Sequence, residues 1–448
     1  MKPAPTVSVP IPEPPEAEAA EVESAALELE AESIPSGWTA VFRAFSHRNY
    51  RLYFSGQLVS LIGTWIQTVA QAWLVLRLSN SSFMLGVVAF AGFTPILLNG
   101  LFAGVVIDHV DRRRLIVATQ TILMVNAFTL SALTWWHVVR VEHVIILAAL
   151  NGLVSSFDMP GRQSFVVEMV GREDLPNAIA LNSMMFNGAR AIGPAIAGLL
   201  LLGFGEAGCF FLNGLSFLAV IWSLLQMDVP RRARTSFRSA MLARVREGLN
   251  YVWHHGATFY LLLLVAINSG FAVPFTVLVP VFARDLLHGG PRAYGFLLAS
   301  QGVGAVLGAL VMASSSSASR RLRHNLTFGI FCMAIGVMLF GLSRWMALSM
   351  SAEFLVGVGL MNYMATTNTL VQLFVSDELR GRVMSIYTLS FIGMAPLGSL
   401  EVGFIGQHVG PRAAVFGCGL VALTCGCILL TRLTLIAAEQ ARREAVEA

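Results

Sequence analysis

Arg190 is a charged residue in the middle of a long apolar run, residues 177–203, which has the length of a bilayer-spanning helix. An arginine near the bilayer centre is costly unless it faces a cavity or pairs with a carboxylate, so ionisable residues in membrane helices are candidates for function. Arg190 is therefore predicted to serve a transport pathway. The alternative is a buried ion pair with a structural role.

Two carboxylates could supply both the partner and the chemistry. Glu353 and Glu401 lie in the apolar runs 346–373 and 383–407, each toward the end that we expect to face outside. Desolvation favours the neutral form of a carboxylic acid, so a carboxyl group at such a depth can load and release a proton. We therefore expect proton transfer, with both glutamates as candidate carriers. For Glu401 the alternative is a place near the outer interface.

Pro194 follows Arg190 by one turn and cannot donate a hydrogen bond to the Arg190 carbonyl, so the helix is predicted to kink there. Gly188, Gly193 and Gly198 flank this kink. Amides inside the spans are further candidates for lining a pathway, while most such amides serve as contacts between helices. The candidates are Asn187, Gln71 and Asn151.

A short charged loop lies between the apolar runs 83–107 and 115–136. Gly104 removes a side chain from the last turn of a helix, which lets another helix approach. Asp108 lies at the C-terminus of that helix, where the macrodipole disfavours a carboxylate, so a partner elsewhere is expected. Arg112 and Arg113 follow. The alternative is that the arginines only anchor the cytoplasmic side and Asp108 is solvated.

A second charged pair lies near the cytoplasmic end of the run 143–160, where Asp158 and Arg162 are one helical turn apart. We expect this pair to form a cytoplasmic gate together with Gly104, Asp108, Arg112 and Arg113. In that gate Asp108 would lie over the start of the run 383–407, near Arg382.

These residues require membrane helices to position them. The chain has 448 residues, of which 56% are hydrophobic and 12% charged, about half the charged fraction of a soluble domain. The prediction is an all-α polytopic membrane protein with twelve transmembrane helices in two six-helix halves. The expected spans are 52–76, 83–107, 115–136, 143–160, 177–203, 208–227, 259–283, 293–315, 325–343, 346–373, 383–407 and 412–431.

Basic residues predict the orientation. Most of the 30 Lys and Arg residues fall in the tails and loops on one side, so both termini are expected in the cytoplasm. The net charge of +4 then belongs to loops that face lipid and cytoplasm, and nucleic-acid binding is not expected. No cleavable signal peptide is expected before the first span.

The chain is expected to divide into five segments, with a weak internal repeat between its halves. The linker is expected to contain an amphipathic helix on the membrane surface, over 239–251. The segments are an acidic, Pro-rich disordered tail (1–44), an N-terminal six-helix bundle (45–227), a cytoplasmic linker (228–256), a C-terminal six-helix bundle (257–431) and a cytoplasmic tail (432–448).

Enzymatic chemistry is not indicated. The five cysteines lie in or beside apolar runs and are interpreted as small apolar residues of the core. The sequence shows no metal-ligand cluster, nucleotide-binding loop or catalytic-triad spacing, so no cofactor, metal or catalytic residue is expected. A channel is disfavoured because two halves suit alternating access.

The charged loop, Gly104 to Asp108 followed by paired arginines, resembles the signature loop of the major facilitator superfamily of secondary transporters. His109 and Asp111 stand where that pattern usually has a basic residue and a glycine. The glycine–proline block 188–198 resembles the motif that marks exporters of this superfamily.

Four stretches together, residues 42–52, 158–163, 181–198 and 379–398, resemble the bacterial branch that includes the enterobactin exporter and the macrolide efflux proteins. The resemblance implies proton-driven export of a siderophore, an antibiotic or another small hydrophobic molecule across the inner membrane. The Arg-containing sequence often found in the middle of the fourth span of multidrug exporters is absent from residues 150–154.

Two alternatives remain open. One is an uptake carrier of the same fold for a metabolite, against which the glycine–proline block argues. The other is a non-transporting membrane sensor or assembly protein that uses the acidic tail. Arg190 and Glu353 argue against it, because unused charges inside a membrane are expensive.

Overall fold

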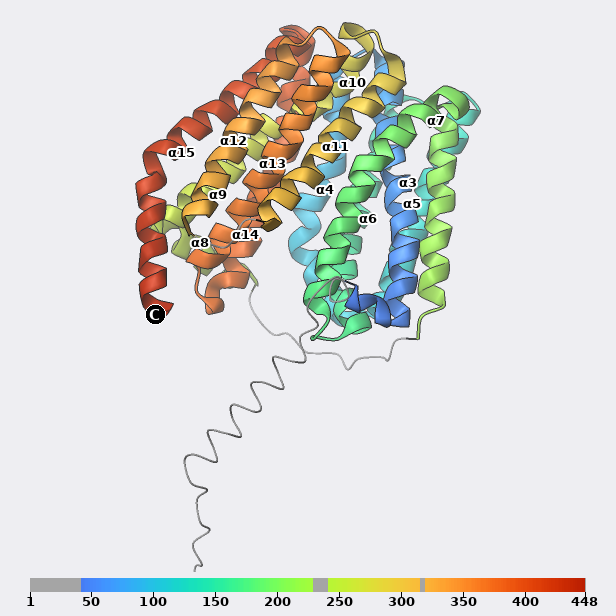
Figure 1. Ribbon diagram of the computed structural model, residues 1–448. Helices are drawn as coiled ribbons and strands as arrows, with labels where there is room; N and C mark the ends of the chain where they lie inside the picture. The colour runs from blue at the N-terminus through green and yellow to red at the C-terminus, as the bar shows by residue number, and fades with distance from the viewer. Residues whose placement is uncertain (1–41, 229–240, 315–318, 448) are drawn as a thin grey trace, which may run out of the picture.

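Helices account for all regular structure in the described part of the chain. The computed structural model describes residues 42–228, 241–314 and 319–447 (Figure 1). The N-terminal half contains η1 (Arg43–Ser46), α3 (Arg48–Ser79), α4 (Ser82–His109), α5 (Arg112–Trp135), α6 (Val141–Val170) and α7 (Leu175–Leu225).

The remaining helices form a linker and the C-terminal half. They are α8 (Met241–His254), α9 (Gly256–Ile267), η2 (Asn268–Ala272), η3 (Val273–Leu278), α10 (Val279–Val281), η4 (Phe282–Leu286), α11 (Gly290–Ser314), α12 (Ser319–Leu342), α13 (Met346–Phe374), α14 (Asp377–His408) and α15 (Pro411–Glu447). In Figure 1 the blue-to-green half lies beside the yellow-to-red half.

The membrane-spanning segments agree with the predicted fold. Ten stretches of the described chain are long and apolar enough to cross a bilayer. One of them, α7, has 51 residues and bends at Gly205, whose φ of 63° lies in the left-handed region that glycine adopts easily, so it supplies two crossings. The more polar α13 has 29 residues and lies among the other spans. The prediction of twelve transmembrane helices in two six-helix halves is thereby confirmed.

The seventh span is not one continuous α-helix, which the sequence analysis did not anticipate. Its α-helix α9 ends at Ile267 and is followed by a π-helical turn (η2), a 3-10 segment (η3) and a second π-helical turn (η4). Pro274 and Pro280 each remove a backbone donor from this stretch. Gly398 of α14 packs so closely here that a Cβ would lie 1.7 Å from the Gly270 carbonyl oxygen.

The two halves make close contacts toward the end of the bundle far from the start of α3 and the end of α15, called the outer end below. A Cβ on Gly86 of α4 would lie 2.4 Å from the Ser399 carbonyl oxygen of α14. A Cβ on Gly198 of α7 would lie 3.0 Å from the Pro291 carbonyl oxygen of α11. Toward the other end, which carries the start of α3 and the end of α15, the ribbons of the two halves diverge (Figure 1).

The linker helix α8 packs against the C-terminal half at the end opposite the outer end. The Tyr251 hydroxyl donates to the Phe374 carbonyl oxygen of α13 at 3.0 Å. Gly248 lies against Arg382 and Ile386 of α14. Within the described residues, α8 covers Met241–His254, so the helix predicted over 239–251 is present from residue 241, and residues 239–240 lie outside the described part of the chain.

Candidate functional site

Arg190 and Gln301 connect the two halves through a polar contact. Arg190 lies near the middle of the first crossing of α7, and its Nη2 donates to Gln301 Oε1 of α11 at 3.4 Å. Gln301 is buried, with 4% of its surface exposed. The Gln301 Nε2 atom has no hydrogen-bond partner in the described part of the chain.

Glu353 lies on α13 in the same region. It is fully buried, and neither carboxyl oxygen has a hydrogen-bond partner among the described residues. The carboxyl group interacts electrostatically with the Arg190 guanidinium and with Tyr294 of α11. A buried carboxyl group without hydrogen bonds favours its neutral form, whereas the nearby cation favours the ionised form. A carboxyl group near a cation has the chemistry needed for proton exchange.

Close helix packing fixes this cluster. A Cβ on Gly302 of α11 would lie 2.4 Å from Ala191 Cα and 2.9 Å from the Arg190 carbonyl oxygen. That is the oxygen to which Pro194 cannot donate. On the other side, a Cβ on Gly357 of α13 would lie 2.0 Å from the Gln301 carbonyl oxygen. The glycines let α7, α11 and α13 meet where the three polar side chains lie.

Aromatic side chains from α3 border the cluster. The rings of Trp73 and Tyr294 stack across the two halves, with centroids 6.4 Å apart and an interplanar angle of 25°. The rings of Trp65 and Phe186 meet edge to face at 6.1 Å. α3 thus closes one side of the cluster with apolar surface.

Two of the three glycines around Pro194 make tight contacts. A Cβ on Gly193 would lie 2.5 Å from Trp65 Cβ, so α3 and α7 approach closely there. Gly198 lies against Pro291, Arg292 and Gly295 of α11. A Cβ on Gly188 would meet nothing within 4 Å. Gly193 and Gly198 therefore have a packing role, which Gly188 does not share.

The other predicted pathway residues are not brought into this cluster. Glu401 has an exposed side chain on α14, on the side facing Cys418 of α15. Asn187 donates to the Ser183 carbonyl oxygen at 2.9 Å, and Asn151 accepts from Ser155 Oγ at 3.3 Å, so both bond within their own helices. Gln71 is half-buried on α3.

Asp158 and Arg162 form an ion pair within the N-terminal half. Asp158 Oδ2 lies 2.8 Å from Arg162 Nε, and Asp158 is buried, with 1% exposed. Asp158 Oδ1 also accepts from Thr119 Oγ1 at 2.7 Å and Gln120 Nε2 at 2.9 Å. These bonds tie α6 to α5.

The arginines of the charged loop also hold helix ends of the N-terminal half. Arg112 Nη1 lies 2.5 Å from Glu168 Oε1 of α6, and Arg113 Nη2 donates to the Leu225 carbonyl oxygen of α7 at 2.8 Å. A Cβ on Gly104 would meet nothing within 4 Å.

Asp108 lies in the last turn of α4, but its side chain lies outside the described part of the structure. Arg382, expected near Asp108, forms an ion pair with Glu247 of the linker helix α8.

Polar bonds at the outer end join the halves at the turn between α3 and α4. Arg284 Nη1 of η4 donates to the Leu76 carbonyl oxygen at 3.0 Å and to Asn80 Oδ1 at 2.8 Å. Gln407 Oε1 of α14 accepts from the Ser82 amide at 3.0 Å. Two side chains of the C-terminal half thus satisfy helix-end groups of the N-terminal half.

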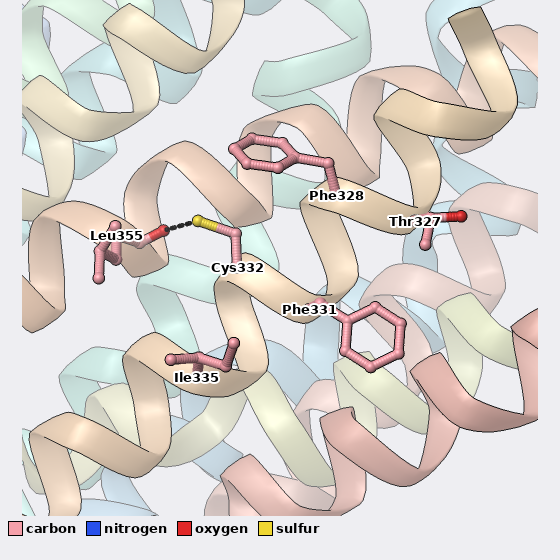
Figure 2. A pocket seen from close by; sticks show the side chains of 6 residues that line it. All are labelled: Thr327, Phe328, Phe331, Cys332, Ile335 and Leu355. Atoms are coloured by element: carbon pink, nitrogen blue, oxygen red, sulfur yellow. Dashed lines mark hydrogen bonds between the residues drawn. The ribbon is translucent and has the colours of Figure 1, made fainter.

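A separate apolar hollow lies between α12 and α13 (Figure 2). Its volume is about 390 Å³, and Thr327, Phe328, Phe331, Cys332, Ile335 and Leu355 line it. Cys332 Sγ donates to the Leu355 carbonyl oxygen at 3.4 Å. Among the described residues, no group of His, Cys, Asp and Glu side chains could hold a metal ion.

Sequence reasoning identified Arg190 and Glu353 but missed Gln301 and Tyr294. Gln301 is an amide inside the predicted span 293–315, so it carried the same signal as Asn187 and Gln71. The sequence does not show which amide faces Arg190.

The transmembrane secretion effector family matches residues 39–447. Three relatives are proteins from bacteria. The staphyloferrin A transporter of Staphylococcus aureus is 27% identical over 360 residues, which cover 78% of this chain and 87% of that protein. The multidrug efflux pump Tap of Mycolicibacterium fortuitum is 26% identical over 375 residues, which cover 82% of this chain and 91% of that protein. Macrolide efflux protein A of Streptococcus pyogenes is 22% identical over 378 residues, which cover 81% of this chain and 92% of that protein.

A solved structure shares the fold. A peptide transporter, POT, in complex with sulfate superposes with a TM-score of 0.72 at 12% identity, covering 91% of this chain and 98% of that one. At this identity the likeness concerns the fold alone.

Proposed function

Because the chain belongs to the transmembrane secretion effector family of the major facilitator superfamily, we propose that it exports a small hydrophobic molecule in exchange for protons. The resemblance to this superfamily and to its efflux branch is confirmed by the family match and by the relatives. The protein is a multi-pass membrane transporter. We place it in the bacterial inner membrane with both termini in the cytoplasm, since the basic residues favour that orientation.

The proposed substrate is of the drug, antibiotic or siderophore type. The relatives support this range, because their names refer to a staphyloferrin, to multiple drugs and to macrolides. The family of secretion effectors and the efflux pumps among the relatives favour export over uptake of a metabolite. Nucleic acid has no part in this proposal.

The observation that carries proton exchange is the buried carboxyl group of Glu353 beside Arg190. The two residues come from different halves, so the distance between them changes when the halves move relative to each other. With the termini in the cytoplasm, the contacts at the outer end correspond to an inward-facing state. In the proposed cycle Glu353 takes up a proton while the site faces outside and releases it while the site faces the cytoplasm. Substrate enters from the cytoplasm after that release.

The test measures proton movement in inverted membrane vesicles. An inside-acid gradient is imposed and followed by dye quenching while siderophores, macrolides and dyes are added in turn. At least one compound should collapse the gradient with wild-type protein and fail to do so with Glu353→Gln or Arg190→Ala.

The matched control is Glu401→Gln, which removes the other intramembrane glutamate of the same half. Because Glu401 is exposed and its electrostatic neighbour is Cys418 of α15, this variant should respond like the wild type. A full response in Glu353→Gln would overturn the proton-carrier role of Glu353. A response lost only in Glu401→Gln would move that role to Glu401. If no compound in a broad panel acts on correctly inserted protein, proton-coupled export of this substrate range is excluded.

A further inference from the structure

The apolar hollow on α12 lies away from the contacts between the two halves. Five of its lining residues fall between Thr327 and Ile335 of α12, and the sixth is Leu355 of α13. α12 packs mainly against α13 and α15, which both belong to the C-terminal half. The hollow opens outward, because the side chains of Phe328 and Ile335 at its edge are 52% and 49% exposed. In a membrane its occupant therefore comes from the surrounding bilayer and not from the path between the halves.

The interior of the hollow suits hydrocarbon. Its two polar side chains already donate hydrogen bonds within the protein. Thr327 Oγ1 donates to the Arg323 carbonyl oxygen at 2.9 Å, and Cys332 Sγ donates to the Leu355 carbonyl oxygen at 3.4 Å. The other lining side chains are aliphatic or aromatic (Figure 2). A polar ligand would lose hydrogen bonds to water on entering such a site, whereas a hydrocarbon chain has none to lose.

The size of the hollow matches one acyl chain. A closed cavity of about 150 Å³ holds a benzene molecule. The hollow has a volume of about 390 Å³. From Thr327 to Ile335 the helix rises about 12 Å at 1.5 Å per residue. The hydrocarbon of one leaflet is about 15 Å thick, so the hollow follows most of the length of a chain in that leaflet.

Positive charge stands at one end of the hollow. The apolar span of α12 begins at Leu322, so the hollow starts one to two turns inside the membrane from the cytoplasmic surface. In the sequence, no Asp or Glu occurs between Asp285 and Glu353. Three arginines fall at the start of α12, at positions 320, 321 and 323. Basic residues at this level attract the anionic lipids of the cytoplasmic leaflet.

We propose that the hollow binds one acyl chain of an anionic phospholipid of the cytoplasmic leaflet, with the phosphate held by the arginines at the start of α12. The apolar walls take the chain, and the arginines select the charge of the headgroup. A second copy of this chain fits less well, because a two-fold interface through α12 would bring the arginines of both copies together at the same membrane level. The proposal rests on the orientation with both termini in the cytoplasm and is independent of proton exchange.

The test uses the full-length protein in liposomes with two photoreactive lipids that carry the same diazirine-bearing acyl chain. One is phosphatidylglycerol, which is anionic, and the other is phosphatidylcholine, which is zwitterionic. After illumination, mass spectrometry measures how strongly residues 327–335 are labelled. Each arginine near the membrane surface favours an anionic lipid about fivefold. Phosphatidylglycerol should therefore label the hollow about fivefold or more above phosphatidylcholine, and high salt should reduce that excess.

One variant tests the place of the acyl chain. Ile335→Trp puts a large side chain at the edge of the hollow and should reduce the labelling of residues 327–335 by both lipids. The matched control is Val125→Trp, because Val125 lies on α5 of the other half with a side chain 55% exposed. This variant should leave the labelling of the hollow unchanged.

A second variant tests the headgroup. The triple change Arg320→Gln, Arg321→Gln and Arg323→Gln should remove the excess of phosphatidylglycerol, so that the two lipids label the hollow equally. Its matched control is Arg344→Gln, because Arg344 follows α12 at the opposite, outer end. In that variant the excess should remain.

Several results would overturn the proposal. Equal labelling by the two lipids in the wild type, or an excess that persists in the triple variant, would mean that only ordinary boundary lipid covers the hollow. The same conclusion would follow if residues 327–335 were labelled no more strongly than the exposed face of α5. Crosslinks between two copies through residues 327–335, in place of lipid labelling, would assign the hollow to a second copy. None of these results depends on Glu353, so this proposal and the proposed function can fail separately.

Discussion

Arg190 and Glu353 were predictable as single residues, because a charge in an apolar run stands out whatever the fold. Their association was not predictable. They are far apart in the sequence and on different helices, and Glu401 carried the same signal as Glu353. Only packing decides which carboxylate is buried, and here Glu353 is fully buried whereas Glu401 is exposed.

The charge of Arg190 acts on the buried Glu353 carboxyl group and gives a prediction about stability. Arg190→Ala removes that cation, and leaving a buried charge without compensation costs several kcal/mol. Glu353 can reduce that cost by binding a proton. Arg190→Ala should therefore lower the melting temperature in detergent strongly at high pH and less at low pH, measured by scanning fluorimetry.

The double variant Arg190→Ala with Glu353→Gln is the control, because it removes both charges. It should recover much of the melting temperature lost at high pH without recovering proton-coupled transport. Equal destabilisation of single and double variants at every pH would mean that the two charges are not coupled.

Asp158 gives a second prediction at this scale, because its bonds lie inside one half. Asp158→Asn keeps an acceptor for Thr119 but loses the charge that pairs with half-buried Arg162. The melting temperature should fall, by an amount that corresponds to about 1–3 kcal/mol. Transport per folded molecule should change much less.

The control is Arg114→Ala, because the Arg114 side chain is 76% exposed. This variant should leave the melting temperature unchanged. A normal melting temperature with abolished transport in Asp158→Asn would instead support the cytoplasmic gate.

At the scale of helices, the sequence predicted where the spans lie but not how closely they approach. The positions of apolar runs follow from composition alone. The broken seventh span contains Pro274 and Pro280, which are visible in the sequence, whereas the contact of Gly398 of α14 with Gly270 joins segments distant in sequence. A kink was predicted at Pro194 from the residue type, but the non-helical residue inside α7 is Gly205. The glycine that packs beside Arg190, Gly302, belongs to another helix.

Gly302 therefore gives a test of helix packing. In Gly302→Ala the new Cβ would lie 2.4 Å from the Ala191 backbone, so α7 and α11 would have to separate beside Arg190. We expect transport to fall tenfold or more, about 1.4 kcal/mol or above in activation free energy, when measured in inverted vesicles. Gly188→Ala is the matched control, since its Cβ meets open space, and it should transport normally. Normal transport by Gly302→Ala would show that this close contact is dispensable.

At the scale of the whole molecule, the sequence indicated two halves and their orientation, but not which conformation they adopt. The conformation depends on weak bonds between the halves. At the outer end these bonds come from Arg284 and Gln407, which contact the turn that joins α3 to α4. Both are polar residues near the ends of membrane-spanning segments, and nothing in the sequence distinguishes them from other residues of that kind.

Removing these outer bonds should shift the equilibrium between inward-facing and outward-facing states. The double variant Arg284→Ala with Gln407→Ala loses four hydrogen bonds between the halves, together worth about 2–6 kcal/mol. A change of that size raises the population of the outward-open state by a factor of about 30 or more. Double electron–electron resonance between labels on Ser81 and Val409 should then show a longer distance at neutral pH.

The control for this experiment is Arg77→Ala, because Arg77 also lies at the outer end and pairs with Glu206 at 2.7 Å. That pair joins α3 to α7 within the N-terminal half, so its loss should leave the label distance unchanged. If Arg77→Ala lengthened the distance as much as the double variant does, the effect would be a general loosening of the outer end. If only the double variant does so, Arg284 and Gln407 hold the halves together on that side. Breaking the hydrogen bonds of Arg284 and Gln407 is then a required step before Glu353 can take up a proton from outside.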